Sequence, residues 1–477
     1  MLHKNFINGE WVEGVSAKDN INPSDTREVV GTYAQGDATQ TEAAIAAARA
    51  AFPGWAATTP QQRADILEKI GIEIAARKDE LGALLSREEG KPLAFGVGEA
   101  LRAGQIFKFY AQEALRQEGV AIPSVRPGVD VVITREPLGV VGIISPWNFP
   151  IAIPAWKIAP ALAFGNTVVF KPADLVPASA WALVEIASRS GLPPGVLNLV
   201  MGRGSVVGQT LLDHRDVNAI SFTGSVETGA RVAASCSLRG AKYQLEMGGK
   251  SPLIVMDDAD LDAAALAAVD GAFYQTGQRC TANSRLVVHE KIHDAFIAKV
   301  VALMKGLKVA HALEAGSVVG PVVDESQLRQ DEMYVRVAQE EGGELVMGGE
   351  RLNRETPGFY FSPALITRTQ NSMRINREEV FGPVASVIKV KDYDEAVQVA
   401  NDTTFGLSSA IFTRSLKLAT DFRKKSAAGM VMVNLATAGV DYHVPFGGRK
   451  GSSYGAREQG RHAVEFYTAI KTAYINA

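Results

Sequence analysis

VVGIISPWNFP at residues 140–150 and FKPAD at residues 170–174 decide the fold of this chain. Each begins as an apolar run and ends in prolines with polar side chains, as a buried strand does where it leaves a sheet. Further apolar runs and the helical segments between them lie at residues 196–200, 219–222, 178–190 and 226–234. Strands that alternate with helices predict repeated βαβ units and a mainly parallel sheet.

A second series of the same kind follows Cys280 and predicts a second α/β lobe. Its expected strands and helices lie near residues 286–288, 385–390, 408–412 and 430–433, and near residues 292–305, 394–400 and 416–425. The predicted fold class is therefore α/β, with two doubly wound, Rossmann-like lobes. We expect residues 1–117 and 139–247 to form the first lobe and residues 248–445 the second.

The remaining segments predict N-terminal helices and a small β arm. Ala-rich periodic segments with helical spacing lie at residues 41–56, 61–85 and 98–116. Residues 119–136 predict an extended hairpin, with which the alternating tail at residues 463–475 can pair. We expect residues 118–138 and 460–477 to form an oligomerisation arm, because its free strand edges would otherwise invite aggregation. The expected assembly is a homodimer or a homotetramer.

Length and charge narrow the class of partner. The 477 residues exceed the size at which one core keeps growing, so two or more domains are expected. A net charge of −3, from 49 basic and 52 acidic side chains, gives no footprint for nucleic acid or an anionic membrane. Prolines and polar residues interrupt the most apolar stretch, residues 139–170, so no membrane span is predicted. A small-molecule partner is expected.

Cysteine and histidine usage bears on compartment and metal content. Two cysteines cannot form a disulfide framework, and the first ten residues contain no apolar signal segment. We therefore expect a reducing, cytoplasmic compartment. Among the seven histidines only His289 and His293 have a ligand-like spacing, and no third ligand stands nearby. No metal is predicted.

A scarce thiol and a carboxylate stand in glycine-marked turns. Cys280 ends the segment GQRC, and Glu246 lies in LEMGGK at residues 245–250. A thiolate attacks carbonyl carbon readily, and a carboxylate can take a proton from water in a second step. A free cysteine is also commonly a small buried hydrophobe. We assign that role to Cys236, and the residues around Cys280 leave both interpretations open for it.

Two glycine-rich segments can bind a dinucleotide phosphate. GRGSVVG at residues 202–208 approaches the dinucleotide fingerprint, but its third glycine comes one place late, so an ordinary strand-to-helix turn explains it equally well. FTGSVETG at residues 222–229 ends a strand in a glycine and a hydroxyl as a helix begins. Helix N-terminal amides bind pyrophosphate in such places.

The whole chain resembles an aldehyde dehydrogenase of the NAD(P)-dependent superfamily, through segments matched in the expected order from Ile144 to Gly451. The resemblance implies that Cys280 is the nucleophile, Glu246 the general base that hydrolyses a thioester, and Asn148 the side-chain donor of the oxyanion hole. It also implies that the first lobe binds NAD, that the second is catalytic, and that residues 445–451 close the site.

The resemblance implies a cofactor site as well. Lys171 and Asp174 match the positions that hold the adenosine ribose, and Ser225 matches the pyrophosphate contact. Many members carry glutamate where this chain has Asp174; a carboxylate there suits a ribose diol and repels a 2′-phosphate, so NAD should be preferred, with NADP possible. The expected cofactor-binding residues are Ile144, Ser145, Pro146, Trp147, Lys171, Asp174, Gly204, Phe222, Gly224, Ser225, Thr228, Glu379 and Phe381.

Arginines near the expected substrate channel indicate an anionic aldehyde. Arg102 is either a fork for a distal carboxylate or a solvated helix residue. With residues 433–444, it resembles the branch of the family that oxidises 2-oxoglutarate semialdehyde (2,5-dioxopentanoate); succinate semialdehyde and broad or aromatic aldehydes are the alternatives. The expected substrate residues are Arg102, Phe149, Trp156, Arg279, Val440 and Phe446.

Two other classes of function remain possible. An enzyme that passes the acyl group to coenzyme A would lack a base, so Glu246 argues against it. A non-catalytic structural protein should have lost part of the set, whereas Cys280, Glu246, Asn148 and Lys171 are all present.

Overall fold

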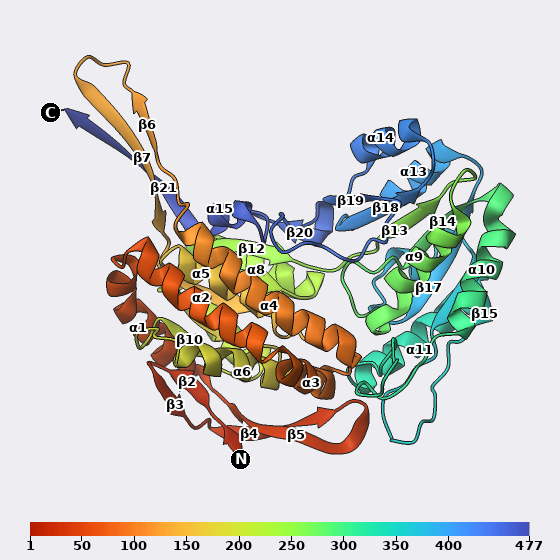
Figure 1. The fold of residues 1–477 in the computed structure, drawn as a ribbon, viewed down its shortest axis with the longest axis horizontal. Coiled ribbons are helices and arrows are strands. Elements are labelled where there is room, and N and C mark those ends of the chain that lie inside the picture. Colours follow the sequence, from red (N-terminus) through yellow and green to blue (C-terminus); the bar gives the residue numbers. More distant parts are fainter. Residues whose placement is uncertain (477) are drawn as a thin grey trace.

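The computed structural model describes residues 1–476, which form two α/β lobes and a projecting β arm (Figure 1). The first lobe is built on an eight-stranded sheet of order β20-β12-β11-β8-β9-β10-β2-β3. Strands β8 to β12 are parallel, and β2, β3 and β20 add antiparallel edges. The bounds are β2 (Asn5–Ile7), β3 (Glu10–Val12), β8 (Val140–Ile144), β9 (Thr167–Lys171), β10 (Leu197–Leu199), β11 (Ala219–Thr223), β12 (Lys242–Glu246) and β20 (Ser453–Tyr454).

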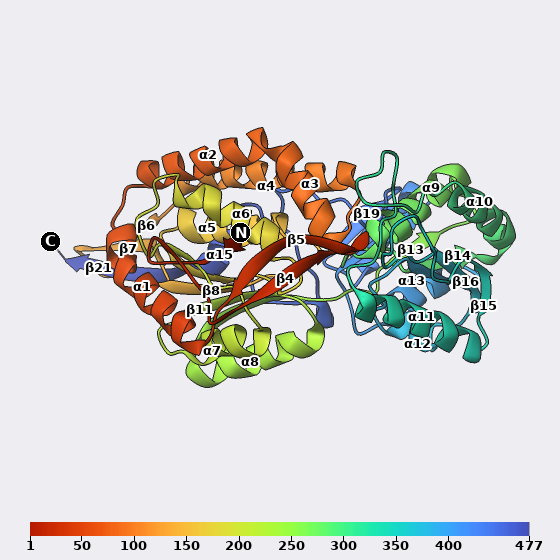
Figure 2. The ribbon, with the colours of Figure 1, turned by 90° about the horizontal axis from the view of Figure 1, so that it is seen from below.

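Helices cover both faces of this sheet, as the doubly wound prediction requires. Figure 2 shows α2, α4, α5 and α6 on one face and α7 and α8 on the other, and each group packs its own apolar core against the strands. The bounds are α1 (Ala38–Ala56), α2 (Pro60–Ala76), α3 (Lys78–Glu89), α4 (Leu93–Ala114), α5 (Ala152–Ala163), α6 (Pro177–Ser188), α7 (Gln209–Asp213) and α8 (Val226–Arg239).

The second lobe has a seven-stranded sheet of order β15-β16-β17-β14-β13-β18-β19, parallel except for its β15 edge. Its strands are β13 (Pro252–Val255), β14 (Arg285–His289), β15 (Glu344–Met347), β16 (Ala364–Thr369), β17 (Val384–Val390), β18 (Ser408–Phe412) and β19 (Met430–Val433). Its helices are α9 (Leu261–Phe273), α10 (His293–Lys305), α11 (Glu325–Glu340), α12 (Arg374–Arg377), α13 (Tyr393–Asn401) and α14 (Leu416–Lys425).

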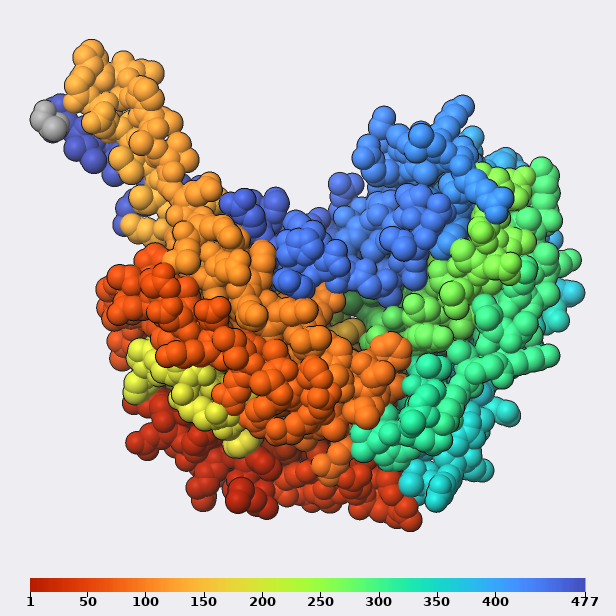
Figure 3. Space-filling model, viewed as in Figure 1, coloured from red at the N-terminus to blue at the C-terminus, as the bar shows by residue number. Residues whose placement is uncertain are grey.

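The arm is a three-stranded sheet of order β21-β7-β6 that extends away from the body (Figure 3). The tail pairs with the hairpin as the alternating pattern predicts, from Thr468 opposite Pro137 to Asn476 opposite Val129. A second three-stranded sheet, β1-β5-β4, lies along the first lobe. The bounds are β1 (Leu2–His3), β4 (Ser16–Asn22), β5 (Asp25–Gln35), β6 (Val120–Pro123), β7 (Val129–Pro137), α15 (Val464–Tyr467) and β21 (Thr468–Asn476).

The predicted α/β class with two lobes is confirmed, and two helix predictions are wrong in detail. The single helix expected at residues 61–85 is broken into α2 and α3 at Arg77, which has φ −98° and ψ 15°. The helix expected from residue 98 begins at Leu93, directly after Pro92, and includes Gly96, which packs against Gly82 of α3. No helix within residues 1–476 has the length and apolarity of a membrane span.

Candidate active site

The candidate site begins at the carboxyl ends of three neighbouring parallel strands. β8 pairs with both β9 and β11, and this register sets Ile144 opposite Lys171 and Phe222. The expected cofactor segments that follow these three residues therefore leave the sheet at one edge. Ligands of open α/β sheets bind at that edge.

Contacts between the lobes bring a second expected segment to the same place. The rings of Trp147, in the loop after β8, and Phe381, before β17, lie 5.3 Å apart in an edge-on arrangement. Glu379 lies beside them, and its Oε1 accepts a hydrogen bond of 2.7 Å from the Gly249 backbone N–H. A Cβ at Gly248 would stand 2.1 Å from Glu379 Oε2, so this close approach requires glycine. Burial raises the pKa of Glu379 to about 7.

Cys280 lies at the junction of the lobes, after a turn in which Gln275, Thr276 and Gly277 all have positive φ. A Cβ at Gly249 would stand 2.4 Å from the Cys280 carbonyl oxygen, so the backbone next to the Glu246 strand touches the cysteine loop. Burial, with smaller contributions from the Glu379 and Glu246 carboxylates, raises the pKa of Cys280 to about 12. The thiol therefore rests protonated and needs a proton acceptor before it attacks a carbonyl.

Asn148 is buried and is fixed at both its amide and its backbone. Its Nδ2 donates a 3.0 Å hydrogen bond to the carbonyl of Gln278, two residues before Cys280. Its carbonyl accepts a 2.6 Å hydrogen bond from Lys91 Nζ, which also forms a buried 2.6 Å ion pair with Glu99. The first contact ties the Asn148 amide to the loop that ends in Cys280, and an oxyanion hole at the thiol requires an amide donor of this kind.

Glu246 ends β12 and is buried, with one carboxylate oxygen occupied. Oε2 accepts a 2.6 Å hydrogen bond from Ser453 Oγ, whereas Oε1 has no partner within residues 1–476. Burial, followed by repulsion from Glu458, raises the pKa of Glu246 well above its ordinary value. Burial with a free oxygen is suited to a general base, which must gain and lose a proton near neutral pH.

Sequence reasoning missed the buried polar groups beneath Glu246. Lys157 on α5 pairs with Glu458, and both side chains are buried. Glu458 also accepts a 2.6 Å hydrogen bond from Trp156 Nε1. Lys157 and Glu458 are separated by 301 residues in the sequence. No local pattern could have revealed their contact.

The adenosine end of the expected cofactor site gathers charged groups. Lys171 is buried, and burial lowers its pKa to about 8. A Cβ at Gly204 would stand 3.9 Å from Lys171 Nζ, so the glycine-rich turn passes beside this lysine. Asp174 Oδ2 pairs with Lys18 at 2.5 Å, and Asp174 Oδ1 has no partner in the described chain. A free carboxylate oxygen beside a lysine fits a ribose diol.

The phosphate end is a capped helix start. Ser225 is the N-cap of α8, and its hydroxyl accepts a 3.3 Å hydrogen bond from the Thr228 backbone N–H. A Cβ at Gly224 would stand 2.6 Å from the Phe222 ring, so glycine is needed at this turn. The Thr223 hydroxyl is buried and unpartnered across residues 1–476. These features fit a dinucleotide phosphate placed at the helix start.

Arg102 is a partly buried cation without a carboxylate partner. Its Nη2 donates a 3.2 Å hydrogen bond to Gln459 Oε1, its Nε has no partner among the described residues, and no ion pair forms there. Burial lowers its pKa. A guanidinium without a carboxylate partner can bind an anionic group of a ligand.

The other expected substrate residues divide into two groups. Trp156 and Phe446 pack together with centroids 5.6 Å apart, Phe149 lies under Lys91 at 3.9 Å, and Val440 is partly buried in its loop. Arg279, by contrast, donates from Nη2 to the backbone carbonyl of Asp270. Because that guanidinium is held by α9, the structure gives no support to its role as a substrate fork.

Comparisons with known proteins identify relatives along almost the whole chain. The chain is 44% identical over 476 residues to the alpha-ketoglutaric semialdehyde dehydrogenase of Bacillus subtilis, covering 99% of this chain and 97% of that protein. It is 41% identical over 476 residues to the alpha-ketoglutarate semialdehyde dehydrogenase of Haloferax volcanii, covering 99% and 98%.

Solved structures share the fold across nearly the whole chain. Betaine aldehyde dehydrogenase from Staphylococcus aureus, in complex with NAD+, has a TM-score of 0.97 at 35% identity and covers 99% of this chain and 94% of its own. An NADP-dependent enzyme of E. coli has a TM-score of 0.96 at 36% identity and covers 100% and 98%. Fold and matches together define an oxidoreductase. The family model described as the aldehyde dehydrogenase family matches residues 11–473, and the chain belongs to that family.

Proposed function

We propose that this protein oxidises an aldehyde to a carboxylic acid with NAD, through a thiohemiacetal and then a thioester on Cys280. The observations that support the proposal are the hydrogen bond from the Asn148 amide to Gln278, two residues before Cys280, and the contribution of the Glu246 carboxylate to the raised pKa of Cys280. One side chain is assigned to each step: nucleophile, oxyanion donor and base.

The residues account for each bond. The Cys280 sulfur bonds to the aldehyde carbon as the thiol proton passes to a carboxylate, and the carbonyl oxygen becomes an oxyanion. Asn148 Nδ2 and the Cys280 backbone N–H are the proposed donors to it, each worth about 3 kcal/mol in comparable sites. A nicotinamide ring held by the expected cofactor residues would supply the hydride acceptor that turns this adduct into a thioester. Glu246 takes a proton from water, the water oxygen bonds to the carbon, and the C–S bond breaks as Glu246 returns that proton to the sulfur to restore the thiol.

We infer that the substrate is a short semialdehyde with a distal carboxylate, with 2-oxoglutarate semialdehyde as the first candidate. The names of the Bacillus and Haloferax relatives support this choice. Arg102 supports it independently, because a partly buried guanidinium without a carboxylate partner suits an anionic ligand. Succinate semialdehyde carries the same distal group and is the alternative.

A panel of aldehydes tests both activity and substrate. We expect 2-oxoglutarate semialdehyde to exceed succinate semialdehyde, and both to exceed butanal and benzaldehyde, in kcat/KM for NAD reduction. Arg102→Ala should cost about 1.5–3 kcal/mol for the acidic substrates and little for the neutral ones. Lys108→Ala, at an exposed position of the same helix, is the control. An equal loss of kcat/KM on all four aldehydes would contradict the proposed carboxylate pocket. No NAD reduction at all would favour a non-catalytic role.

The fate of the acyl group separates hydrolysis from transfer. With Glu246 present as a base, we expect acid to form at the same rate with and without coenzyme A. Product formation that depends on coenzyme A would identify an acylating enzyme instead.

We also propose that the protein is a homodimer or homotetramer assembled through its arm. Ile122 on β6 and Ile470 and Tyr474 on β21 expose apolar side chains on a strand sheet that projects from the body. Light scattering at micromolar concentration should give a multiple of the chain mass, and a monomeric mass would refute the proposal.

The free state of both cysteines supports a reducing, cytoplasmic setting.

A further inference from the structure

Lys18 occupies a position that the sequence did not connect with the cofactor. It lies on β4, and its Nζ pairs with Asp174 Oδ2 at 2.5 Å. Asp174 is the carboxylate expected to favour a free ribose diol over a 2′-phosphate. An ammonium at this distance neutralises the charge that would repel a phosphate.

The pair borders a cavity of about 450 Å³ that also contains a second cation. Arg203 lines this cavity, is exposed, and forms no ion pair with any carboxylate of the described chain. The other acidic residue in the wall, Asp37, is held by the first turn of α1, where its Oδ1 accepts a 2.9 Å hydrogen bond from the Gln40 backbone N–H. The wall therefore carries two cations, Lys18 and Arg203, and two carboxylates, one paired with Lys18 and one bonded to the first turn of α1.

The pair can also be separated at low cost. The Lys18 and Asp174 side chains are 46% and 27% exposed, a range in which ion pairs contribute little net stability. Asp174 Oδ1 remains unpartnered within residues 1–476 while Oδ2 is paired. A ribose hydroxyl can therefore use Oδ1 without displacing Lys18, and an anion can recruit Lys18 without leaving a buried charge.

We propose that Lys18, with Arg203, is the specificity-determining residue that lets this cleft bind 2′-phosphorylated adenine nucleotides, so that NADP as well as NAD serves as cofactor. This inference rests on the proposed function, because it takes Lys171 and Asp174 as the adenosine ribose site. It goes beyond the expectation drawn from Asp174 alone, in which the carboxylate repels the phosphate and NAD is preferred, with NADP possible.

The test compares two ligands that differ only by the phosphate, adenosine 5′-monophosphate and adenosine 2′,5′-bisphosphate, by calorimetric titration of the full-length protein. We expect both to bind. Lys18→Met should weaken the bisphosphate at least about tenfold, because a phosphate contact is lost and Asp174 is unmasked, and should change the monophosphate less than about threefold. Lys18→Arg should retain bisphosphate binding, and Arg203→Met should weaken it in the same direction.

Lys4→Met is the matched control, because Lys4 forms an exposed 3.1 Å pair with Glu13 and does not line the cavity. An unchanged ratio of the two dissociation constants in Lys18→Met overturns the inference, as does an equal loss for both ligands. Failure of the wild-type protein to bind either ligand instead overturns the proposed cofactor site. The ratio of kcat/KM for NADP to that for NAD should fall with Lys18→Met in parallel with the titration.

Discussion

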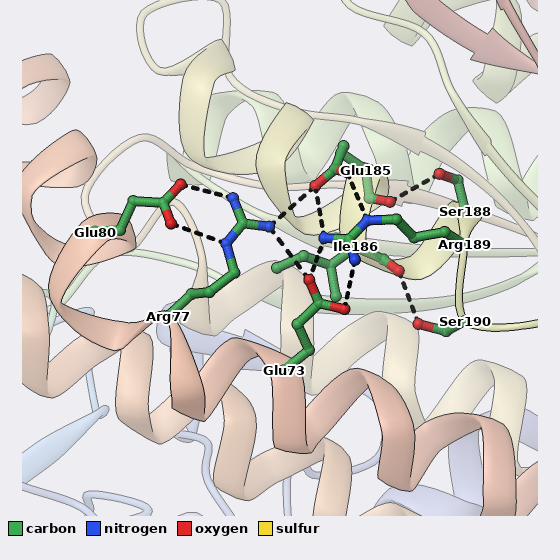
Figure 4. Close-up of polar contacts among 8 residues, drawn as sticks. All are labelled: Glu73, Arg77, Glu80, Glu185, Ile186, Ser188, Arg189 and Ser190. Atoms are coloured by element: carbon green, nitrogen blue, oxygen red, sulfur yellow. Dashed lines mark hydrogen bonds and ion pairs between the residues drawn. The ribbon is translucent and has the colours of Figure 1, made fainter.

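The α2–α6 surface and the catalytic cleft both concentrate ionisable side chains, but they treat charge in opposite ways. On the surface, Arg77 contacts Glu73, Glu80 and Glu185, and Arg189 contacts Glu73 and Glu185, so each charge except Glu80 has at least two partners (Figure 4). In the cleft, carboxyls are buried with few partners, and their pKa values rise instead.

Ionisable groups on the α2–α6 surface contribute to stability, whereas those in the cleft are suited to chemistry. The paired surface acids keep lowered pKa values, as Glu80 and Glu185 do, and stay ionised at neutral pH. Burial in the cleft raises the pKa of Glu246, so this carboxyl takes up a proton more readily than a solvated one, as a general base must. A carboxylate held in ion pairs keeps its charge, whereas a buried carboxyl with few partners takes up a proton more readily.

The largest expected effect is at Glu246. Glu246→Gln should lower steady-state turnover by about 10²–10⁴-fold while leaving a burst of NADH, because the thioester forms but no base activates water. Mass spectrometry should find the acyl adduct on Cys280.

The pH dependence of deacylation provides a second test of Glu246. A general base acts when deprotonated, so wild-type deacylation should rise as pH increases through the raised pKa of Glu246. The variant should lose that rising limb. Unchanged turnover, or a variant whose profile keeps the limb, would take Glu246 out of the mechanism.

A smaller effect is expected at Glu89, a buried carboxyl at the end of α3 with no hydrogen-bond partner on either oxygen across the described chain. Burial raises its pKa to about 8. Between its unfolded value, about 4.5, and pH 8 the folded state keeps a proton that the unfolded state releases, so stability falls as pH rises. Glu89→Gln should therefore unfold at a higher temperature than wild type at pH 8.5, by a difference worth about 1–3 kcal/mol, and should show a flatter pH dependence.

Glu80→Gln is the matched control for Glu89. Its pKa is lowered by Arg77, so the stability it contributes is present above its unfolded pKa and is lost only as pH falls. Between pH 5.5 and 8.5 this control should keep the wild-type slope. A Glu89 variant with the same slope as wild type would show that the carboxyl is solvated.

The smallest effect is expected in the surface network. Arg77→Met should lower the unfolding midpoint by no more than about 2 °C at low ionic strength, because partly exposed pairs contribute about 0–1 kcal/mol. The loss should shrink further in 1 M NaCl. Arg329, which is 73% exposed and pairs with Glu325 alone, provides a control, since Arg329→Met should have no measurable effect. A loss of several degrees that salt does not alter would make the network a packing feature.

The sequence predicted those elements whose signal is local. Strands β18 and β19 and helix α14 occur at the predicted residues, because their apolar runs and caps are contiguous. Strands β15 and β16 were missed, since β15 is a short, half-exposed edge whose partner lies across a long connection. Trp147 and Phe381 were expected in one site, and their contact places both at the same cleft.

Other parts of the site depend on contacts that no short segment encodes. The Ser453 donor to Glu246 is 207 residues away, and Lys18 is 156 residues from Asp174. Arg279 was expected at the substrate because it precedes Cys280; its Nη2 donates to Asp270 of α9, its Nε has no partner within residues 1–476, and its role toward the substrate stays a prediction. Sequence spacing cannot fix the direction of such a side chain.

The edge strand β20 has a consequence for the order in which the protein is made. β20 completes the first sheet by pairing Tyr454 with Leu245 and Ser453 with Glu246. A ribosome delivers these residues only after the entire second lobe has been synthesised, so the nascent first lobe exposes an open strand edge at β12 until β20 has been translated. The proposed base cannot gain its hydroxyl donor before then. A chain that stalls or is cut before residue 453 would therefore contain Cys280 but lack the Ser453 donor to Glu246. Its β12 edge would stay unpaired and exposed to quality-control factors.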